Sequence, residues 1–198
     1  MSVNLPIDEP KITTELDGLK TVVTANGNVN DVAMGIDGAA KFQTNAVVTN
    51  LEVNPNNPDL PYGVKFDTTT TEPSSRSLRG QAGLFKKASI TGSKKGDSVQ
   101  FSGKTTVQRS SLDMGKGADT VTFGAKTKFD KTTTIDLGTA GGKADKVIFK
   151  GRNTAEGGKV VISNFDSKDK LLVKGEVLKQ SDLEDGVKID GIKIEFAD

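Results

Sequence analysis

The chain has 198 residues, of which 34% are hydrophobic and 5% aromatic, with 22 glycines and a formal net charge of +1. It contains no histidine and no cysteine, which excludes nucleophile–histidine pairs, the usual zinc sites and any disulfide scaffold. The length permits one domain or two small ones, and the composition is typical of a thin β-protein with many turns.

Charge is divided unevenly along the chain. Residues 1–80 carry 6 Lys and Arg against 10 Asp and Glu, whereas residues 81–198 carry 21 against 16. This asymmetry favours homotypic contacts or docking on a charged surface, and a solvated surface is the simpler alternative. No apolar run approaches the roughly 20 residues of a membrane span, and the first 20 residues lack the pattern of a signal peptide. We therefore expect synthesis in the cytosol without export by the general secretory route.

Residues 1–66 are predicted to form an N-terminal arm followed by a small β region. Residues 1–18 are polar and contain two prolines, so their composition indicates an extended arm. Two apolar-threaded segments, 20–24 and 28–32, flank Asn26-Gly27, which is a strong signal for a type I′ β-hairpin. This part of the chain is therefore expected to hold a hairpin and an arm.

The next segments contain breakers and small polar residues. Three prolines within residues 54–61 remove backbone donors and fix φ, so this stretch must be irregular. Residues 67–83 are rich in Thr and Ser and are predicted to be a linker. The remaining residues, 84–198, are then predicted to form a separate domain.

One phrase recurs in residues 84–198. Four aspartates, spaced 22, 26 and 24 residues apart, each precede two apolar residues at alternate positions. The copies are Asp97 with Val99 and Phe101, Asp119 with Val121 and Phe123, Asp145 with Val147 and Phe149, and Asp169 with Leu171 and Val173. Alternation places these apolar residues on one face of a strand, and the period is typical of stacked repeats. A second alternating stretch follows each of the first three aspartates, so each repeat is predicted to hold two strands and two corners.

A single repeat cannot bury its own apolar face, so the repeats must stack to make a core. We predict an all-β fold in which residues 84–198 form a short parallel β-solenoid, a β-helix or a β-roll, with rungs of about 24 residues. Val121 and Phe123 should be buried between their equivalents in the neighbouring rungs. Residues 187–196 should form a hairpin at Asp190-Gly191 that caps the last rung.

Residues 115–121, Gly-Lys-Gly-Ala-Asp-Thr-Val, resemble the Gly-x-Gly-x-Asp-x-aliphatic core of the repeats-in-toxin (RTX) nonapeptide. Residues 141–149 and 162–171 resemble the end of such arrays, so the likeness covers roughly residues 113–175. The chain departs from the family because one corner recurs every 22–26 residues instead of two every nine. Lys143 also stands where the family has glycine.

The RTX resemblance implies a calcium site at the glycine-aspartate corners. Its ligands would come from Gly115, Gly117, Asp119, Gly141 and Asp145. The alternative is that each aspartate hydrogen-bonds the backbone of its own turn and forms a ladder without metal. Carboxylates about 5 Å apart in neighbouring rungs repel one another and favour a counterion, and three lysines (Lys116, Lys143 and Lys146) lie close enough in sequence to serve.

Other chemistries have weaker support. A basic column (Lys104, Lys126 and Arg152) lacks interleaved aromatics, so we interpret it as a solvated corner and expect no nucleic-acid partner. No helix follows the Gly-x-Gly at 115–117, which argues against a nucleotide loop. Catalysis would have to rest on carboxylates, as in sugar-cleaving β-helix enzymes, but these line a long groove with aromatics, and this chain has no Trp and one Tyr. We expect no enzymatic activity.

These observations favour a structural or interaction protein. A short Thr-, Asn- and Gly-rich solenoid with an arm and a proline-rich loop is similar to minor virion proteins of tailed phages, particularly capsid decorations and appendages. That likeness implies a virion location, an N-terminal anchor, and partners that are other virion proteins or copies of the chain in a homo-oligomer or lattice. The alternative is a secreted, calcium-binding RTX-like protein exported through an uncleaved C-terminal signal.

Overall fold

The structure is a computed structural model of the whole chain. It describes residues 2–4, 12–17, 20–25, 29–44, 47–67, 83–139, 142–151, 153–155, 157–178, 182–183, 187–189 and 191–197. Residues 68–82, which make up most of the predicted linker, lie outside these ranges. Over the described residues the chain is all-β, and no helix there is long and apolar enough to cross a membrane.

The strands belong to two sheets, which we call sheet A and sheet B. Sheet B contains β2 (Ile12–Asp17), β3 (Lys20–Ala25), β5 (Gly38–Thr44), β7 (Tyr62–Asp67), β10 (Ser98–Ser102), β13 (Thr120–Phe123), β16 (Lys146–Phe149), β19 (Lys170–Val173) and β20 (Glu176–Leu178). Sheet A contains β1 (Ser2–Asn4), β4 (Val29–Ile36), β6 (Val47–Pro55), β8 (Gly83–Lys86), β9 (Ser89–Thr91), β11 (Thr105–Gln108), β12 (Ser111–Asp113), β14 (Lys128–Phe129), β15 (Thr133–Asp136), β17 (Thr154–Ala155), β18 (Lys159–Ser163), β21 (Val187–Ile189) and β22 (Ile192–Ala197).

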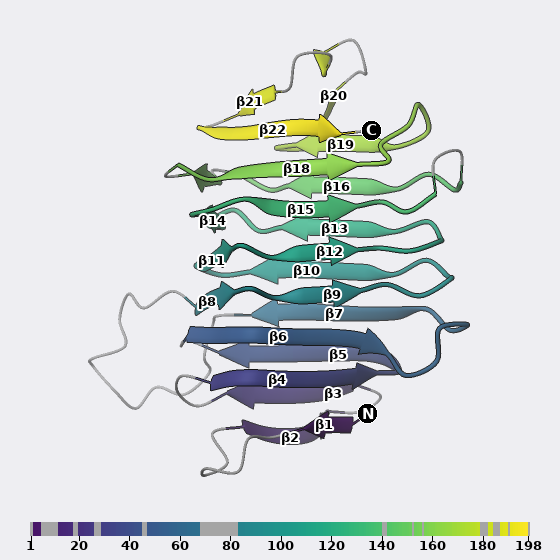
Figure 1. Ribbon diagram of the computed structural model, residues 1–198, viewed down its shortest axis with the longest axis vertical. Coiled ribbons are helices and arrows are strands. Elements are labelled where there is room, and N and C mark those ends of the chain that lie inside the picture. The colour runs from purple at the N-terminus through teal and green to yellow at the C-terminus, as the bar shows by residue number, and fades with distance from the viewer. Residues whose placement is uncertain are drawn as a thin grey trace.

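Most strand pairs are parallel and join one repeat to the next. Figure 1 shows the strands stacked in chain order from the N-terminal end to the C-terminal end, with strands of the two sheets alternating along the stack. Val121 lies between Val99 and Val147, and Phe123 lies between Phe101 and Phe149. Both side chains are 0% exposed, so the predicted inward columns are confirmed.

Aromatic rings continue this packing along the core. The ring of Phe123 stacks on Phe101 at 5.5 Å and on Phe149 at 5.1 Å between centroids. Phe101 in turn stacks on Phe66 at 4.9 Å. These offset contacts add to the burial of apolar surface that drives the repeats together.

The prediction of two strands per repeat is wrong, because a third short strand precedes each second stretch. β8, β11, β14 and β17 form their own ladder at one edge of sheet A, beside the ladder of β9, β12, β15 and β18. The long strand β6 pairs with both β8 and β9, so it spans the two ladders. The bend between the ladders falls at Asn50, Lys87 and Arg109, which all have positive φ (52°, 56° and 51°). Each bend turns the chain so that the short strand also faces the core.

The predicted N-terminal hairpin is also wrong. β3 pairs with β2 and β5 in sheet B, whereas β4 pairs with β1 and β6 in sheet A. Asn26-Gly27 lies outside the described residues. Val23 on β3 and Val32 on β4 both face the core from opposite sheets, an arrangement that a hairpin within one sheet would not permit.

Antiparallel strands close both ends of the stack. β2 and β1 cover β3 and β4 at the N-terminal end, so the described parts of the predicted arm are paired strands. β20 and β21 cover β19 and β22 at the C-terminal end, which confirms the predicted C-terminal hairpin. The pairing also continues past residues 68–82, because β7 pairs with both β5 and β10. Strands on either side of the predicted linker therefore belong to the same two sheets.

Candidate functional site

The candidate site lies at the corner where the chain leaves sheet A and enters sheet B. Corners of neighbouring repeats touch closely here. Gly138 has a φ of +83°, and a Cβ atom at that position would overlap the carbonyl oxygen of Gly115 in the preceding repeat. Gly115 itself has a φ of +74°. The glycines are thus required by the stacking of backbone on backbone, independently of any ligand.

The repeated aspartates form a hydrogen-bonded column at this corner. The backbone N–H of Asp97 donates to Oδ1 of Asp119 over 2.7 Å. The N–H of Asp119 donates to Oδ1 of Asp145 over 2.7 Å, and the N–H of Asp145 donates to Oδ1 of Asp169 over 2.8 Å. Each carboxylate therefore holds the backbone of the preceding repeat, one rung away.

The two ends of the column also use their own turns. Asp97 accepts hydrogen bonds from the N–H and the hydroxyl of Ser93 in its own turn, and it accepts the N–H of Tyr62 from the preceding repeat. Oδ2 of Asp169 accepts the N–H of Asp166 over 2.8 Å. The predicted hydrogen bonds from an aspartate to its own turn are thus present only at the two ends of the column. Along the column, from Asp97 to Asp169, the hydrogen bonds join each repeat to the next.

Burial shifts the titration of the middle of the column. Asp119 is 1% exposed, and its Oδ2 has no hydrogen-bond partner among the described residues. Burial raises the pKa of Asp119 to about 7, an effect partly offset by the Asp97 N–H and reinforced by the charges of Asp145 and Asp97. Burial likewise raises the pKa of Asp145 to about 6, against the hydrogen bond from the Asp119 N–H. Near neutral pH, Asp119 can hold a proton while Oδ1 still accepts the neighbouring N–H.

The predicted calcium ligands are only partly brought together. Gly115, Gly117, Asp119 and Asp145 lie in neighbouring corners, and Gly141 is outside the described residues. Calcium takes six to eight oxygen ligands. In the part of the chain that the structure describes, no group of three or more acidic side chains could hold a metal, and Oδ1 of each aspartate already accepts a backbone N–H. Calcium binding at this corner stays a prediction from the RTX resemblance.

A shallow cavity of about 340 Å³ adjoins the column. Its lining includes Asp145, Gly115 and Gly117, together with three lysines (Lys94, Lys116 and Lys143). Lysines supply donors and positive charge, which is the opposite of a cation site. Two of the three lysines considered as counterions from the sequence, Lys116 and Lys143, line this cavity, and their role as counterions stays a prediction.

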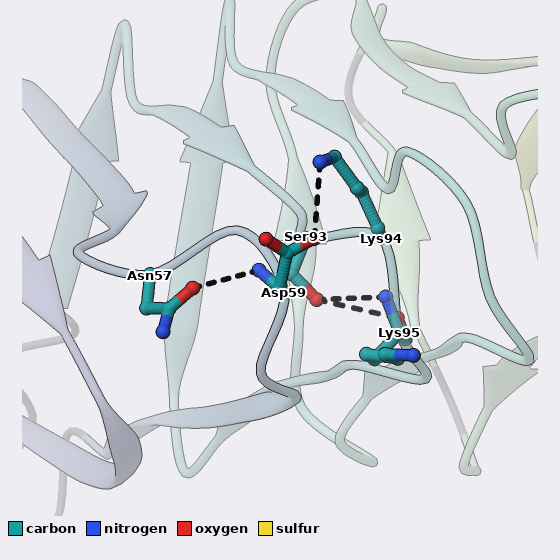
Figure 2. A network of polar contacts seen from close by, with 5 residues as sticks. All are labelled: Asn57, Asp59, Ser93, Lys94 and Lys95. Atoms are coloured by element: carbon teal, nitrogen blue, oxygen red, sulfur yellow. Dashed lines mark hydrogen bonds and ion pairs between the residues drawn. The ribbon is translucent and has the colours of Figure 1, made fainter.

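The proline-rich loop also contacts this corner, a contact that sequence reasoning missed. Figure 2 shows Asn57 and Asp59 beside Ser93, Lys94 and Lys95. The Lys94 ammonium lies 3.0 Å from Oδ1 of Asp59, and its backbone N–H donates to the carbonyl oxygen of Pro58 over 2.8 Å. The Lys95 N–H donates to the Ser93 hydroxyl over 3.0 Å. The loop therefore fastens the turn that begins the aspartate column.

The predicted basic column is only partly described. Lys104 and Lys126 are exposed at turns that follow β10 and β13, and Arg152 lies outside the described residues. The absence of a nucleic-acid partner stays a prediction.

No protein-family model, curated protein or solved structure matches this chain. The resemblances to RTX repeats and to phage virion proteins therefore rest on the sequence features given above.

Proposed function

We propose that the chain is a non-enzymatic structural protein, a short β-solenoid displayed on the surface of a tailed-phage virion. The observation that carries this proposal is the aspartate column. The repeated aspartates are the best candidates for chemistry in a chain without His or Cys. Three of them, Asp97, Asp119 and Asp145, are buried, and the column bonds one repeat to the next. Their role is then to hold the stack together.

The strand order supports the solenoid part of the proposal. The chain passes from a sheet B strand through sheet A strands and returns to sheet B beside its starting strand, from β10 to β13 and from β13 to β16. Each turn pairs mainly with the turns before and after it, as in other repeat architectures. Such a stack makes a stiff element whose outer faces are available for display.

The virion setting is supported by the Thr-, Asn- and Gly-rich composition, which is similar to that of capsid decorations and appendages. In this proposal the N-terminal part, residues 1–66, anchors the protein on the particle. Because β3, β5 and β7 lie in the same sheet as the later repeats, the anchor is one end of the stack.

Antibodies on purified particles test the proposal. Particles released from cells that carry the gene are purified by density gradient and probed with antibodies raised against residues 84–198. We expect these antibodies to label intact particles in electron micrographs. Antibodies against residues 1–66 serve as the matched control, and they should label only disrupted particles. If the protein stays in the soluble fraction of the gradient, the virion proposal is wrong.

A further inference from the structure

The outer face of each sheet carries a pair of like charges in register, and the two pairs are opposite in sign. On sheet B, the side chains of Lys146, Ile148 and Lys150 alternate with buried core residues, and Lys170 and Leu172 repeat this pattern on the next strand. We call these five residues the basic face. On sheet A, Asp113 on β12 and Asp136 on β15 point outward from buried Leu112 and Ile135. We call these two aspartates, with Ser111 and Thr134 beside them, the acidic face.

Like charges lie side by side on both faces. Lys146 is in register with Lys170, and Asp113 is in register with Asp136. Adjacent like charges destabilise a sheet. At the position of Lys146, the preceding strands carry Ser98 and Thr120, so the fold itself does not demand charge there.

These charges have no ion-pair partner among the described residues. Other charged groups on the surface do have one. Lys41 and Lys65 both lie within 3.6 Å of the Asp67 carboxylate, and Glu195 pairs with lysines on its own and the adjacent strand. The repulsion on the two faces is therefore not relieved within the described part of the chain.

The two faces match each other in spacing. Each like-charged pair sits on adjacent parallel strands, so both pairs are separated by roughly 4.8 Å. Two lysines of one copy can thus meet two aspartates of another in the same register. The basic face is apolar at its centre, where Ile148 and Leu172 lie next to Val177, which is 53% exposed. Beside the acidic face, half-buried Val161 on β18 lies in register with Thr134 on β15.

We propose that the chain associates with a second copy of itself, the acidic face of one copy docking on the basic face of the other. The contact joins different surfaces on the two partners, so it is heterologous and generates a ring or an open series of copies. This inference goes beyond the proposed function and does not depend on the virion setting, because it concerns the purified protein alone.

Two neutral double variants test the contact. Lys146→Gln with Lys170→Gln neutralises the two lysines of the basic face that lie in register, and leaves Lys150 unchanged. Asp113→Asn with Asp136→Asn neutralises the acidic face and keeps the amide oxygens that accept the N–H groups of Gly115 and Gly138. Melting curves for each variant show that it is folded before association is measured.

Association is measured by sedimentation velocity at about 10 mM ionic strength, where the screening of charges is weak. The wild-type protein should show a mass that rises with concentration beyond the dimer and falls on addition of about 0.5 M salt. Each variant alone should self-associate about tenfold or more weakly. A mixture of the two variants should form one-to-one heterodimers and nothing larger, because each heterodimer has a single intact pair of faces.

Three results would overturn the inference. The first is a wild-type protein that stays monomeric at low salt over the whole concentration range. The second is association of either variant as strong as that of the wild type. The third is a mixture of folded variants that forms no heterodimer.

Discussion

The N-terminal half of the stack (β1 to β7) and the C-terminal half (β8 to β22) keep their strands in register by different means. In the N-terminal half the strands are long, with 8 residues in β4 and 9 in β6, and they pair along most of their length. In the C-terminal half the strands from β8 to β21 have 2 to 5 residues, and the aspartate column adds a hydrogen bond at each corner. In the earlier repeats the positions in register with Asp97 are Tyr62 and Gly38, neither of which has a carboxylate. Asp37, one residue before Gly38, is exposed and accepts a hydrogen bond from the side-chain amide of Asn56.

The comparison indicates that buried corner carboxylates compensate for short strands. A long strand supplies enough backbone hydrogen bonds to fix its register alone, whereas a strand of four residues needs a further contact at its end. The sequence repeat is visible only in the half where the corner aspartate is required. A long strand requires only alternating apolar residues, and many residue types satisfy that requirement.

The largest expected effect is the loss of an aromatic ring from either half. Phe42→Ala and Phe123→Ala should each cost about 3–5 kcal/mol of unfolding free energy, because both side chains are fully buried against other rings. Since strands of both halves share the same sheets, each variant should lower one common unfolding transition in urea. Thr120→Ala, on the outer side of β13, is the control and should cost less than about 0.5 kcal/mol.

Two separate transitions, with Phe42→Ala shifting only one of them, would contradict a continuous stack. That result would instead support the boundary that the sequence predicts at residues 67–83.

The corner column gives the next largest effect. Asp119→Ala leaves the buried N–H of Asp97 without its acceptor, which should cost about 1–3 kcal/mol in urea unfolding at pH 8. Asp119→Asn keeps an amide oxygen at the same place and removes a buried charge, so it should be nearly neutral or stabilising at that pH. If the alanine and asparagine variants lose equal stability, Asp119 does not stabilise the fold through this hydrogen bond.

The repeat could be predicted from the sequence because its chemistry is periodic. Val121 and Phe123 recur at the same distance from an aspartate, and alternation alone assigns them to the core. The third strand of each repeat could not be found in this way. Its bend falls on Lys87 and Arg109, which carry no turn signal although their φ is positive, and β14 and β17 have two residues each.

The location of the candidate site could be predicted from the sequence, but the contacts made by its side chains could not. The repeat brings Asp119 and Asp145 to one corner, as expected. That each carboxylate turns inward to the N–H of the preceding aspartate follows from corner geometry, which the alternation of a strand does not determine. The same limit applies to Asn26-Gly27, since two residues between apolar segments suit a hairpin as well as a change of sheet.

The raised pKa of Asp119 in the column predicts a smaller, pH-dependent effect on the free energy of unfolding. The folded-state pKa of Asp119, about 7, lies above its ordinary value of 3.8, so between these values the folded protein binds more protons than the unfolded chain. Stability should therefore fall as the pH rises from about 4 to 7, by an amount on the order of 1 kcal/mol or more. Asp119→Asn should remove most of this dependence, leaving the part due to Asp145. A wild-type stability that rises over this range would show that the column is ionised in the folded state.

The smallest expected effect concerns calcium, which would act only on the corners of the C-terminal half. A ligand that binds the folded state raises the melting temperature by mass action. Because Oδ1 of Asp119 and of Asp145 is occupied by backbone N–H groups and three lysines line the adjoining cavity, we expect the same melting temperature in millimolar calcium and in excess chelator. Magnesium at equal ionic strength is the control for a general salt effect. A rise specific to calcium, lost in Asp119→Asn, would instead favour the RTX-like alternative and would mean that the corner rearranges around the ion.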